Sequence, residues 1–350
     1  MKNTLIIEIS CENLDRGKLN YCGEVLKGGG TVVFPTETVY GLGANAIYEK
    51  AVEKIFKAKG RPSDNPLIVH VTGEEDVIPL VKAIPPKAKE VMDAFWPGPL
   101  TIIMEKSSRV PYNVTAGLNT VAIRYPAHPI AKALIEAAGV PIAAPSANIS
   151  GKPSPTKASH VIDDLDGRVD VIIAGGDCSV GLESTVLDMT TDIPTILRPG
   201  GVTKEELEGV LGRVEMDPSL LTGVLDISPK SPGMKYTHYS PKAEVVVYAG
   251  EDESVVKAIS NKANELMANG KEVGIICTNE TQHRYKKGII KPLGSKKDMK
   301  TIAAKLFSTL REFDETKVDI ILAEALEEVE LGQAIMNRLV KAAGYKIYRV

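Results

Sequence analysis

The 350-residue sequence has few cysteines, few aromatic residues and little net charge, and the cysteine pattern and the net charge limit the classes of protein to which it can belong. The four cysteines are scattered without a CxxC pair, so we interpret them as reduced, small apolar residues of a cytosolic chain. Aromatic residues make up 5% of the chain, with one tryptophan. A formal net charge of −3 argues against a protein that coats nucleic acid through bulk electrostatics, although it allows brief tRNA contact through a local patch.

Long apolar runs are also missing. No run approaches the ~18 residues that a membrane-spanning helix needs, so we expect no membrane partner. The N-terminal MKNTLIIEIS is too short in its apolar part and too acidic for a signal peptide. We therefore expect a cytoplasmic protein.

Several motifs that carry well-known chemistry are absent. There is no GxxxxGK[ST], no GxGxxG that opens a helix, no HExxH and no Ser-His-Asp or Cys-His set. Gly28-Gly29-Gly30 is interpreted as a turn that ends a helix capped by Asn13. His128, His160 and His283 each stand alone and are interpreted as structural or exposed. Without clustered carboxylates, we expect no tight protein metal site.

Residues 31–70 are the most informative stretch that is present. An apolar β-branched run from Thr31 to Phe34 predicts a buried strand, which Pro35 ends. Hydroxyl groups, one carboxylate and glycines follow, in the order Thr36, Glu37, Thr38, Tyr40, Gly41 and Gly43. Hydroxyls donate and accept hydrogen bonds and glycines let a ligand approach the backbone, so we expect a ligand site here.

The helix predicted after this loop ends at Lys59-Gly60-Arg61-Pro62, because proline forbids its continuation. Two cations at a helix C-terminus are common without any ligand, since the helix dipole favours them there. Here Asn65 and His70 follow closely in the sequence. Two cations, an amide and an imidazole around one turn suit a polyanion such as a nucleoside triphosphate.

Later loops carry polar side chains next to apolar strands. Arg124 ends one strand, where an anion and a structural salt bridge are equally good partners for it. Ser146 and Asn148 follow another strand, Ser184 precedes one, and Arg198 ends one. We expect these loops to converge at one edge of a sheet, where α/β folds bind ligands.

These blocks resemble the YrdC-type threonylcarbamoyl-AMP synthases. The resemblance rests on PTETVYGLGANA at 35–46, on KGRPSDNPLIVH at 59–70, and on the pairing of Lys59-x-Arg61 with Ser146-x-Asn148. It spans about residues 5–212 through five blocks in order, and the chain is similar to the long, two-domain members. The resemblance implies an L-threonylcarbamoyladenylate synthase, a nucleotidyltransferase that uses L-threonine, bicarbonate or CO2, and ATP.

The resemblance also implies two sets of binding residues. The ATP set is Lys59, Arg61, Asn65, Thr120, Ser146, Asn148, Thr156, Arg198, Tyr236 and His238. The L-threonine set is Thr38, His70, Arg124, Ser146 and Ser184. Lys59 and Arg61 are expected to be catalytic by neutralising the phosphates, with Mg²⁺ held mainly by those phosphates.

The implied reaction has two steps. The amine of L-threonine attacks bicarbonate or CO2, and the resulting carboxylate attacks the α-phosphate of ATP and releases pyrophosphate. The product would pass to a separate tRNA threonylcarbamoyltransferase for N6-threonylcarbamoyladenosine modification at tRNA position 37. We expect no stable nucleic-acid partner.

The fold expected is α/β with two domains. Residues 1–216 would form a YrdC-like twisted mixed sheet flanked by helices, and residues 217–242 a proline-rich linker that covers the active site. Residues 243–350 alternate strands and helices, which predicts a smaller, Rossmann-like, mostly parallel domain without a catalytic cluster. Within it, Asn337 and Arg338 are interpreted as solvated surface residues.

Two alternatives remain open from the sequence. The first is an RNA-binding or regulatory module of the same fold without synthase activity. The second is a carbamoyl-transfer enzyme, like the YrdC-like domains of larger hydrogenase-maturation proteins. Those proteins carry acylphosphatase and zinc-finger segments, which this chain lacks.

Overall fold

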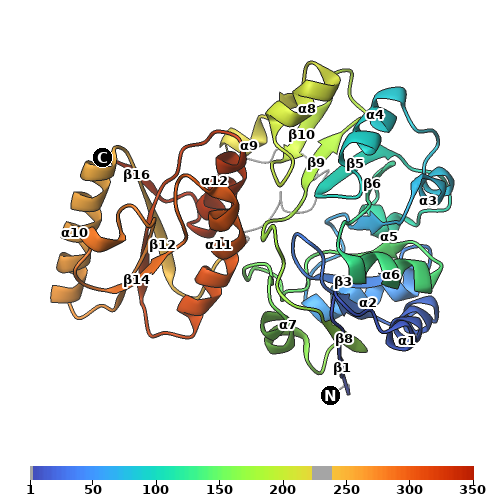
Figure 1. Cartoon of the computed structure of the whole chain (residues 1–350), viewed down its shortest axis with the longest axis horizontal. Helices are drawn as coiled ribbons and strands as arrows, with labels where there is room; N and C mark the ends of the chain where they lie inside the picture. Colours follow the sequence, from blue (N-terminus) through green and yellow to red (C-terminus); the bar gives the residue numbers. More distant parts are fainter. Residues whose placement is uncertain (1–2, 223–238) are drawn as a thin grey trace. The chain divides into compact units, whose positions relative to one another are not determined.

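The structure, a computed structural model, describes residues 3–222 and 239–350 (Figure 1). The described chain divides into two compact units. The first unit holds 3–150, 154–179 and 183–222, and the second holds 151–153, 180–182 and 239–350. The sequence did not predict that two short inner segments group with the second unit. One of them is bonded there by Arg311, whose Nε donates to Pro153 O at 3.0 Å.

The first unit is built on an eleven-stranded mixed sheet. Its strands are β1 (Leu5–Glu8), β2 (Val32–Phe34), β3 (Gly41–Asn45), β4 (Ile68–His70), β5 (Leu100–Glu105), β6 (Thr120–Arg124), β7 (Ile142–Ala143), β8 (Val171–Ala174), β9 (Thr185–Asp188), β10 (Thr195–Arg198) and β11 (Glu215–Met216). Their order across the sheet is β1-β8-β2-β3-β7-β4-β6-β5-β9-β10-β11. The expectation of a mixed sheet is confirmed, since the sheet contains both parallel pairs such as β4–β6 and antiparallel pairs such as β4–β7.

Helices cover both faces of this sheet (Figure 1). They are α1 (Arg16–Lys27), α2 (Glu49–Lys59), α3 (Glu74–Val77), α4 (Pro86–Phe95), α5 (Tyr112–Thr115), α6 (Pro129–Ala138), α7 (Ala158–Leu165), α8 (Lys204–Leu211) and α9 (Ser219–Thr222), with a 3-10 turn at Ile78–Leu80. The cap of α1 is Asp15, whose carboxylate accepts from Lys18 N. The prediction of Asn13 was therefore wrong, because Asp15 is the residue with the extended cap conformation.

Successive residues of the central strands pack into two different cores. Val32 and Phe34 of β2 lie in the core beneath α1 and α6, whereas Val33 lies in the core that contains α2 and α4 residues. Side chains of a strand alternate between the two faces of a sheet. Because both faces are covered, the strands read as continuous apolar runs, which is why the sequence revealed them.

The sequence analysis missed β3. Its glycines were interpreted as openings for a ligand, but they lie in a strand that pairs antiparallel with β2. A Cβ on Gly43 would come within 2.8 Å of both Ile142 Cγ2 and Phe34 Cε1. Close packing of the strand, and not ligand approach, therefore explains Gly43.

The second unit holds a five-stranded sheet with the order β14-β13-β15-β12-β16. Its strands are β12 (Glu244–Ala249), β13 (Val273–Cys277), β14 (Ile289–Pro292), β15 (Ile320–Glu324) and β16 (Ile347–Arg349), and its helices are α10 (Asp252–Ala268), α11 (Met299–Asp314) and α12 (Leu331–Ala342), with a 3-10 turn at Gln282–Arg284. Every pair of neighbouring strands is parallel. The expected Rossmann-like parallel sheet is thus confirmed.

Two buried polar groups in the second unit were not expected. Arg338 is 0% exposed, so its interpretation as a surface residue was wrong. Glu324 ends β15 and is also buried, and its carboxylate accepts hydrogen bonds from Thr281 Oγ1 at 2.8 Å and Tyr285 Oη at 2.6 Å. Glu324 is fully bonded within the unit, so we interpret it as structural.

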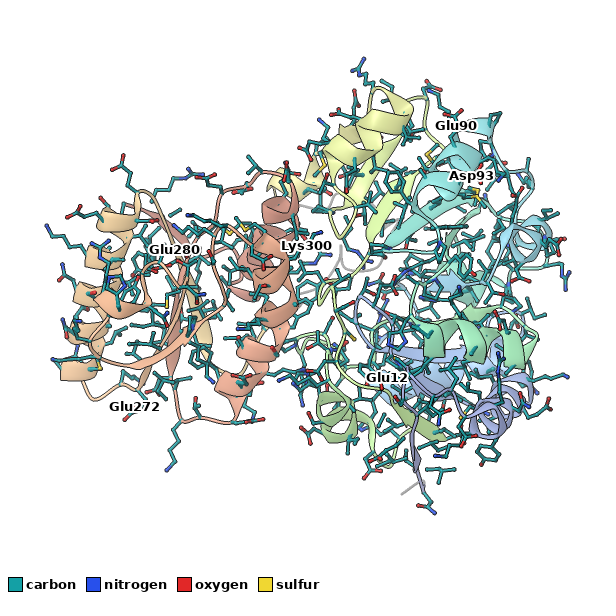
Figure 2. All side chains as sticks on the ribbon, in the orientation of Figure 1. Glu12, Glu90, Asp93, Glu272, Glu280 and Lys300 are labelled. Carbon is teal, nitrogen blue, oxygen red and sulfur yellow. The ribbon has the colours of Figure 1, made fainter. Side chains whose placement is uncertain are left out.

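Charged side chains line the outside of each unit. Figure 2 shows Glu90 and Asp93 projecting from α4, and Glu272 and Glu280 lying on the second unit. Within the described ranges, no helix has both the length and the apolar character needed to cross a membrane.

Candidate active site

Arg124 is the centre of the first cluster of predicted site residues. It ends β6, is 4% exposed, and bonds to the 35–40 loop that follows β2. Its Nη2 donates to Glu37 Oε1 at 2.6 Å, its Nη1 donates to Thr38 Oγ1 at 2.8 Å, and its Nε donates to Gly98 O at 3.2 Å. The structural salt bridge, which was one of the two partners considered for Arg124 from the sequence, is therefore present with Glu37, and it holds the hydroxyl-rich loop against the sheet.

The charge states of this cluster follow from burial and from Arg124. Burial alone would raise the pKa of Glu37, but the charge and hydrogen bond of Arg124 hold that pKa below its usual range. His70 lies beside Arg124 in the paired strands β4 and β6. Burial, together with the Arg124 charge, lowers the pKa of His70 to about 3, so its imidazole is neutral at physiological pH.

Lys59 is the centre of a second cluster. It is the last residue of α2 and is 2% exposed. Its Nζ donates to the backbone carbonyls of Ser146 and Asn148, the latter at 2.6 Å. The Ser146 hydroxyl in turn donates to Asn148 Oδ1. The structure thus joins the two halves of the Lys-x-Arg and Ser-x-Asn signature, and gives Lys59 a positioning task besides the predicted catalytic one.

Asn65 and Thr156 are buried, and their side-chain polar atoms have no hydrogen-bond partner among the described residues. Asn65 is 0% exposed, and its backbone carbonyl accepts from Arg61 Nη2 at 3.0 Å. In the part of the chain that is described, both side-chain atoms of Asn65 and the Oγ1 of Thr156 lack a hydrogen-bond partner. An unsatisfied buried polar atom costs about 1–3 kcal/mol, so such atoms are typical of groups that bond to a ligand.

Ser184 and Arg198 form a third cluster at β9 and β10. The Nε of Arg198 donates to Ser184 O at 3.0 Å, and its Nη2 lies 3.2 Å from Ser184 Oγ. The hydroxyls of Ser184 and Thr101 are 2.7 Å apart. Thr101 pairs directly with Arg124 in β5 and β6, so it links this cluster to the first. The sequence analysis did not assign Thr101 to the site.

Strand register places some members of the two predicted ligand sets at opposite ends of the β4–β6 pair. His70 pairs with Arg124, so these threonine-set residues lie side by side. Thr120 lies at the other end of β6, roughly 13 Å from Arg124 at ~3.3 Å per residue. Because Ile68 pairs with Ala122, Thr120 is level with the segment that contains Asn65. The two ATP-set residues therefore share one end of the β4–β6 pair.

The expectation that the polar loops converge at one edge of the sheet is contradicted by the strand directions. Since β7 is antiparallel to β4, Ser146 follows the end of β7 at one edge, whereas His70 ends β4 at the other. The loops are joined by backbone hydrogen bonds instead. Ala147 N donates to Tyr40 O at 2.8 Å, and Tyr40 N donates to Pro155 O at 2.9 Å.

Two predicted residues cannot be placed. Tyr236 and His238 lie outside the described residues. No group of three or more His, Cys, Asp or Glu side chains that could hold a metal ion occurs within residues 3–222 or 239–350.

Comparison with known proteins decides the family. A family model described as "Telomere recombination" (Sua5/YciO/YrdC) matches residues 24–200, and a model described as "Threonylcarbamoyl-AMP synthase, C-terminal domain" matches residues 202–344. The chain belongs to the Sua5/YciO/YrdC family. The predicted family, and its long form with a second domain, are thereby confirmed.

Relatives cover both domains of this Sua5-type chain. It is 48% identical to a threonylcarbamoyl-AMP synthase of Pyrococcus abyssi over 99% of this chain and 100% of the relative. It is 51% identical to a threonylcarbamoyl-AMP synthase of Bacillus subtilis over 91% of this chain and 90% of the relative. The crystal structure of P. abyssi Sua5 in complex with L-threonine matches with a TM-score of 0.95, 48% identity, and coverage of 99% of this chain and 100% of that one.

Proposed function

We propose that this protein is an L-threonylcarbamoyl-AMP synthase that uses L-threonine, bicarbonate or CO2, and ATP, and that releases pyrophosphate. The observation that carries the proposal is the likeness along nearly the whole chain to two threonylcarbamoyl-AMP synthases at 48% and 51% identity. The match to a Sua5 structure that contains L-threonine supports the amino-acid substrate.

The threonine end of the site is assigned to Thr38, His70, Arg124, Ser146 and Ser184. A guanidinium has five N–H donors, and Arg124 uses three of them in bonds to described residues. Two N–H groups therefore suit the substrate carboxylate, in the bidentate manner that arginine favours. A neutral His70 accepts or donates one hydrogen bond without adding charge beside Arg124.

The nucleotide end is assigned to the ATP set predicted from the sequence, Tyr236 and His238 included. Asn65 and Thr156 support this assignment, because their buried polar atoms lack partners within residues 3–222 and 239–350. Lys59, Arg61 and Arg198 would stabilise the negative charge that develops on the phosphates. Since those two ranges contain no carboxylate or imidazole cluster suited to a metal, we propose that Mg²⁺ is held mainly by the phosphate oxygens.

The proposed chemistry depends on positioning and charge rather than on a covalent enzyme intermediate. The substrate amine first gains a carboxyl group from bicarbonate or CO2. The new carboxylate then attacks the α-phosphate of ATP, and pyrophosphate leaves. We propose that the product serves a separate tRNA threonylcarbamoyltransferase, and that the enzyme works in the cytoplasm, where ATP and tRNA are available.

The test is pyrophosphate release from ATP and bicarbonate, with L-threonine, with L-serine, and without an amino acid. Release that depends on L-threonine is expected, together with a product of the mass of threonylcarbamoyl-AMP. Release without amino-acid dependence would instead indicate a nucleotide pyrophosphatase. Saturable RNA binding without any release would favour the alternative of an RNA-binding module.

A further inference from the structure

One buried hydroxyl outside both predicted ligand sets holds the backbone segment that follows β8. Tyr40 is 0% exposed, and its Oη donates to Gly176 O at 2.6 Å and accepts from Gly175 N at 3.2 Å. Burial raises the pKa of Tyr40, so the hydroxyl stays protonated at physiological pH and can donate. The Tyr40 hydroxyl, which the sequence placed among the groups that could meet a ligand, is therefore engaged within the protein.

Segment 175–178, to which these two glycines belong, is closely packed. A Cβ on Gly175 would come within 2.6 Å of both Pro35 Cγ and Ile130 Cδ1. Gly176 has a φ of +88°, a left-handed conformation that glycine adopts without strain. Because Pro35 and Tyr40 both lie in the loop that follows β2, that loop fixes the segment at two points.

The segment passes this constraint to Thr156 of the predicted ATP set. Cys178 N donates to Thr156 O at 2.9 Å, and the backbone N of Tyr40 donates to Pro155 O at 2.9 Å. The Thr156 hydroxyl is buried and has no hydrogen-bond partner within residues 3–222 and 239–350. The position of this hydroxyl is thus set by backbone bonds that begin at Tyr40 and at segment 175–178.

The predicted threonine set is anchored separately. Thr38 Oγ1 accepts from Arg124 Nη1 at 2.8 Å, and the hydroxyls of Ser184 and Thr101 are 2.7 Å apart. Neither anchor includes the Tyr40 hydroxyl. Loss of that hydroxyl should therefore affect the two ligand ends unequally, since groups that share no bonding partner respond independently.

We propose that Tyr40 is a positioning residue for the nucleotide, and that its hydroxyl acts through segment 175–178 to place Thr156 Oγ1 against bound ATP. Tyr40 touches no substrate in this assignment and acts only through the residues that it holds. The inference rests on the proposed function and deepens it, because it gives the nucleotide end a support that lies in the loop of the threonine end.

The first experiment measures, by calorimetry on full-length Tyr40→Phe, the binding of α,β-methylene-ATP with Mg²⁺ and, separately, of L-threonine. The methylene bridge prevents release of pyrophosphate, so binding is measured without turnover. The variant keeps the backbone bonds of Tyr40 to Pro155 O and from Ala147 N, and loses only the hydroxyl. We expect the nucleotide analogue to bind roughly 5- to 10-fold more weakly, the effect of one neutral hydrogen bond, and L-threonine affinity to change by less than about twofold. In steady-state assays, KM for ATP should rise by the same factor, while KM for L-threonine stays the same.

Tyr285→Phe is the matched control. Tyr285 is 4% exposed, its hydroxyl donates to Glu324 Oε1 at 2.6 Å, and it belongs to neither ligand set. The control is expected to lower the melting temperature and to leave both affinities unchanged. If Tyr40→Phe does the same, its hydroxyl is only structural and the proposal is overturned. Equal weakening of both ligands overturns it as well.

A second variant tests segment 175–178 from its other end, without any change to Tyr40. Gly176→Ala forces a side chain into a left-handed conformation, although nothing lies within 4 Å of the new Cβ. The same loss of nucleotide affinity is expected, with L-threonine affinity retained. Gly139→Ala, at the C-terminal cap of α6 with a φ of +61° and equally open space, is the control for backbone strain alone. Unchanged nucleotide affinity in Gly176→Ala overturns the proposal even if Tyr40→Phe does not fold.

Failure of the proposed function is distinguished by the wild-type protein. Wild type that neither binds L-threonine nor releases pyrophosphate in its presence would overturn that function before any variant is made. Threonine-dependent release by wild type, together with equal nucleotide affinity in wild type and both variants, would overturn the positioning role of Tyr40 alone.

Discussion

Replacement of Asn65 by leucine is expected to stabilise the free protein while it removes nucleotide binding. Asn65 is 0% exposed, and within the described chain neither Oδ1 nor Nδ2 has a hydrogen-bond partner. Leucine has nearly the same shape and removes both unsatisfied atoms. The backbone carbonyl that accepts from Arg61 is kept in the variant.

The magnitude follows from those two atoms. Each unsatisfied buried group costs about 1–3 kcal/mol. Allowing for imperfect packing of leucine, we expect unfolding of the first unit to require about 1–3 kcal/mol more than in wild type. For a domain of this size, that corresponds to a rise in melting temperature of roughly 2–4 °C per kcal/mol. Loss of two hydrogen bonds to the nucleotide should weaken ATP binding roughly 10- to 100-fold.

Thermal melts with and without ATP measure both effects in one assay. Wild type should gain stability when ATP is added, because ligand binds only to the folded state. The variant should melt higher than wild type without ATP and gain little with it. Asn20→Leu on α1, an exposed position, should change stability by less than about 0.5 kcal/mol. A variant that melts below wild type without ATP would refute the reasoning, since Asn65 would then be bonded in the free protein.

Three further predictions follow from the same structure. Arg124→Met should lower the free energy of unfolding by about 3–5 kcal/mol, because it leaves the buried Glu37 carboxylate without its ion-pair partner, and adding Glu37→Gln should restore more than half of that loss. Strictly additive losses of the two substitutions in denaturant melts would contradict this prediction. Because the pKa of His70 is lowered to about 3 in the folded protein, the unfolded chain binds more protons between pH ~6.5 and ~3, and the free energy of unfolding should fall on acidification by up to ~1.4 kcal/mol per pH unit in that range. The fall should be smaller in His70→Gln, and thermal melts between pH 7 and 5 that change equally in both proteins would disprove this prediction. Gly43→Ala should cost about 1–3 kcal/mol, because its Cβ would lie 2.8 Å from two buried side chains, whereas Gly73→Ala meets nothing within 4 Å; equal melting temperatures for the two variants would contradict the packing argument.

Patterns within short segments of the sequence were enough to predict much of the fold and several residues of the site. The buried strands were visible as continuous apolar runs, because helices cover both faces of the sheet. The second unit was visible as alternating strands and helices, since parallel strands need long crossover connections. The blocks around Lys59, Asn65 and Asn148 could be recognised because their residue types and order lie within short, continuous segments.

Other features depended on residues that are distant in the chain. The β3 strand was missed because its glycines resemble a loop until Phe34 and Ile142 are seen against them. The antiparallel pairing of β4 and β7, which contradicts the prediction of one shared sheet edge, is set by register between residues about 70 positions apart.

Two buried polar residues, Glu37 and His128, show the same division most clearly. His128 stood alone in the sequence, and Glu37 was only a carboxylate in a loop. Folding buries both, joins Glu37 to Arg124, and leaves one side-chain atom on each without a partner among the described residues. The sequence by itself determined most of the strands, the family and the residue types of the site. Only the tertiary structure decided which charges meet and which polar atoms remain unpaired, because burial and pairing depend on the whole fold rather than on neighbouring residues.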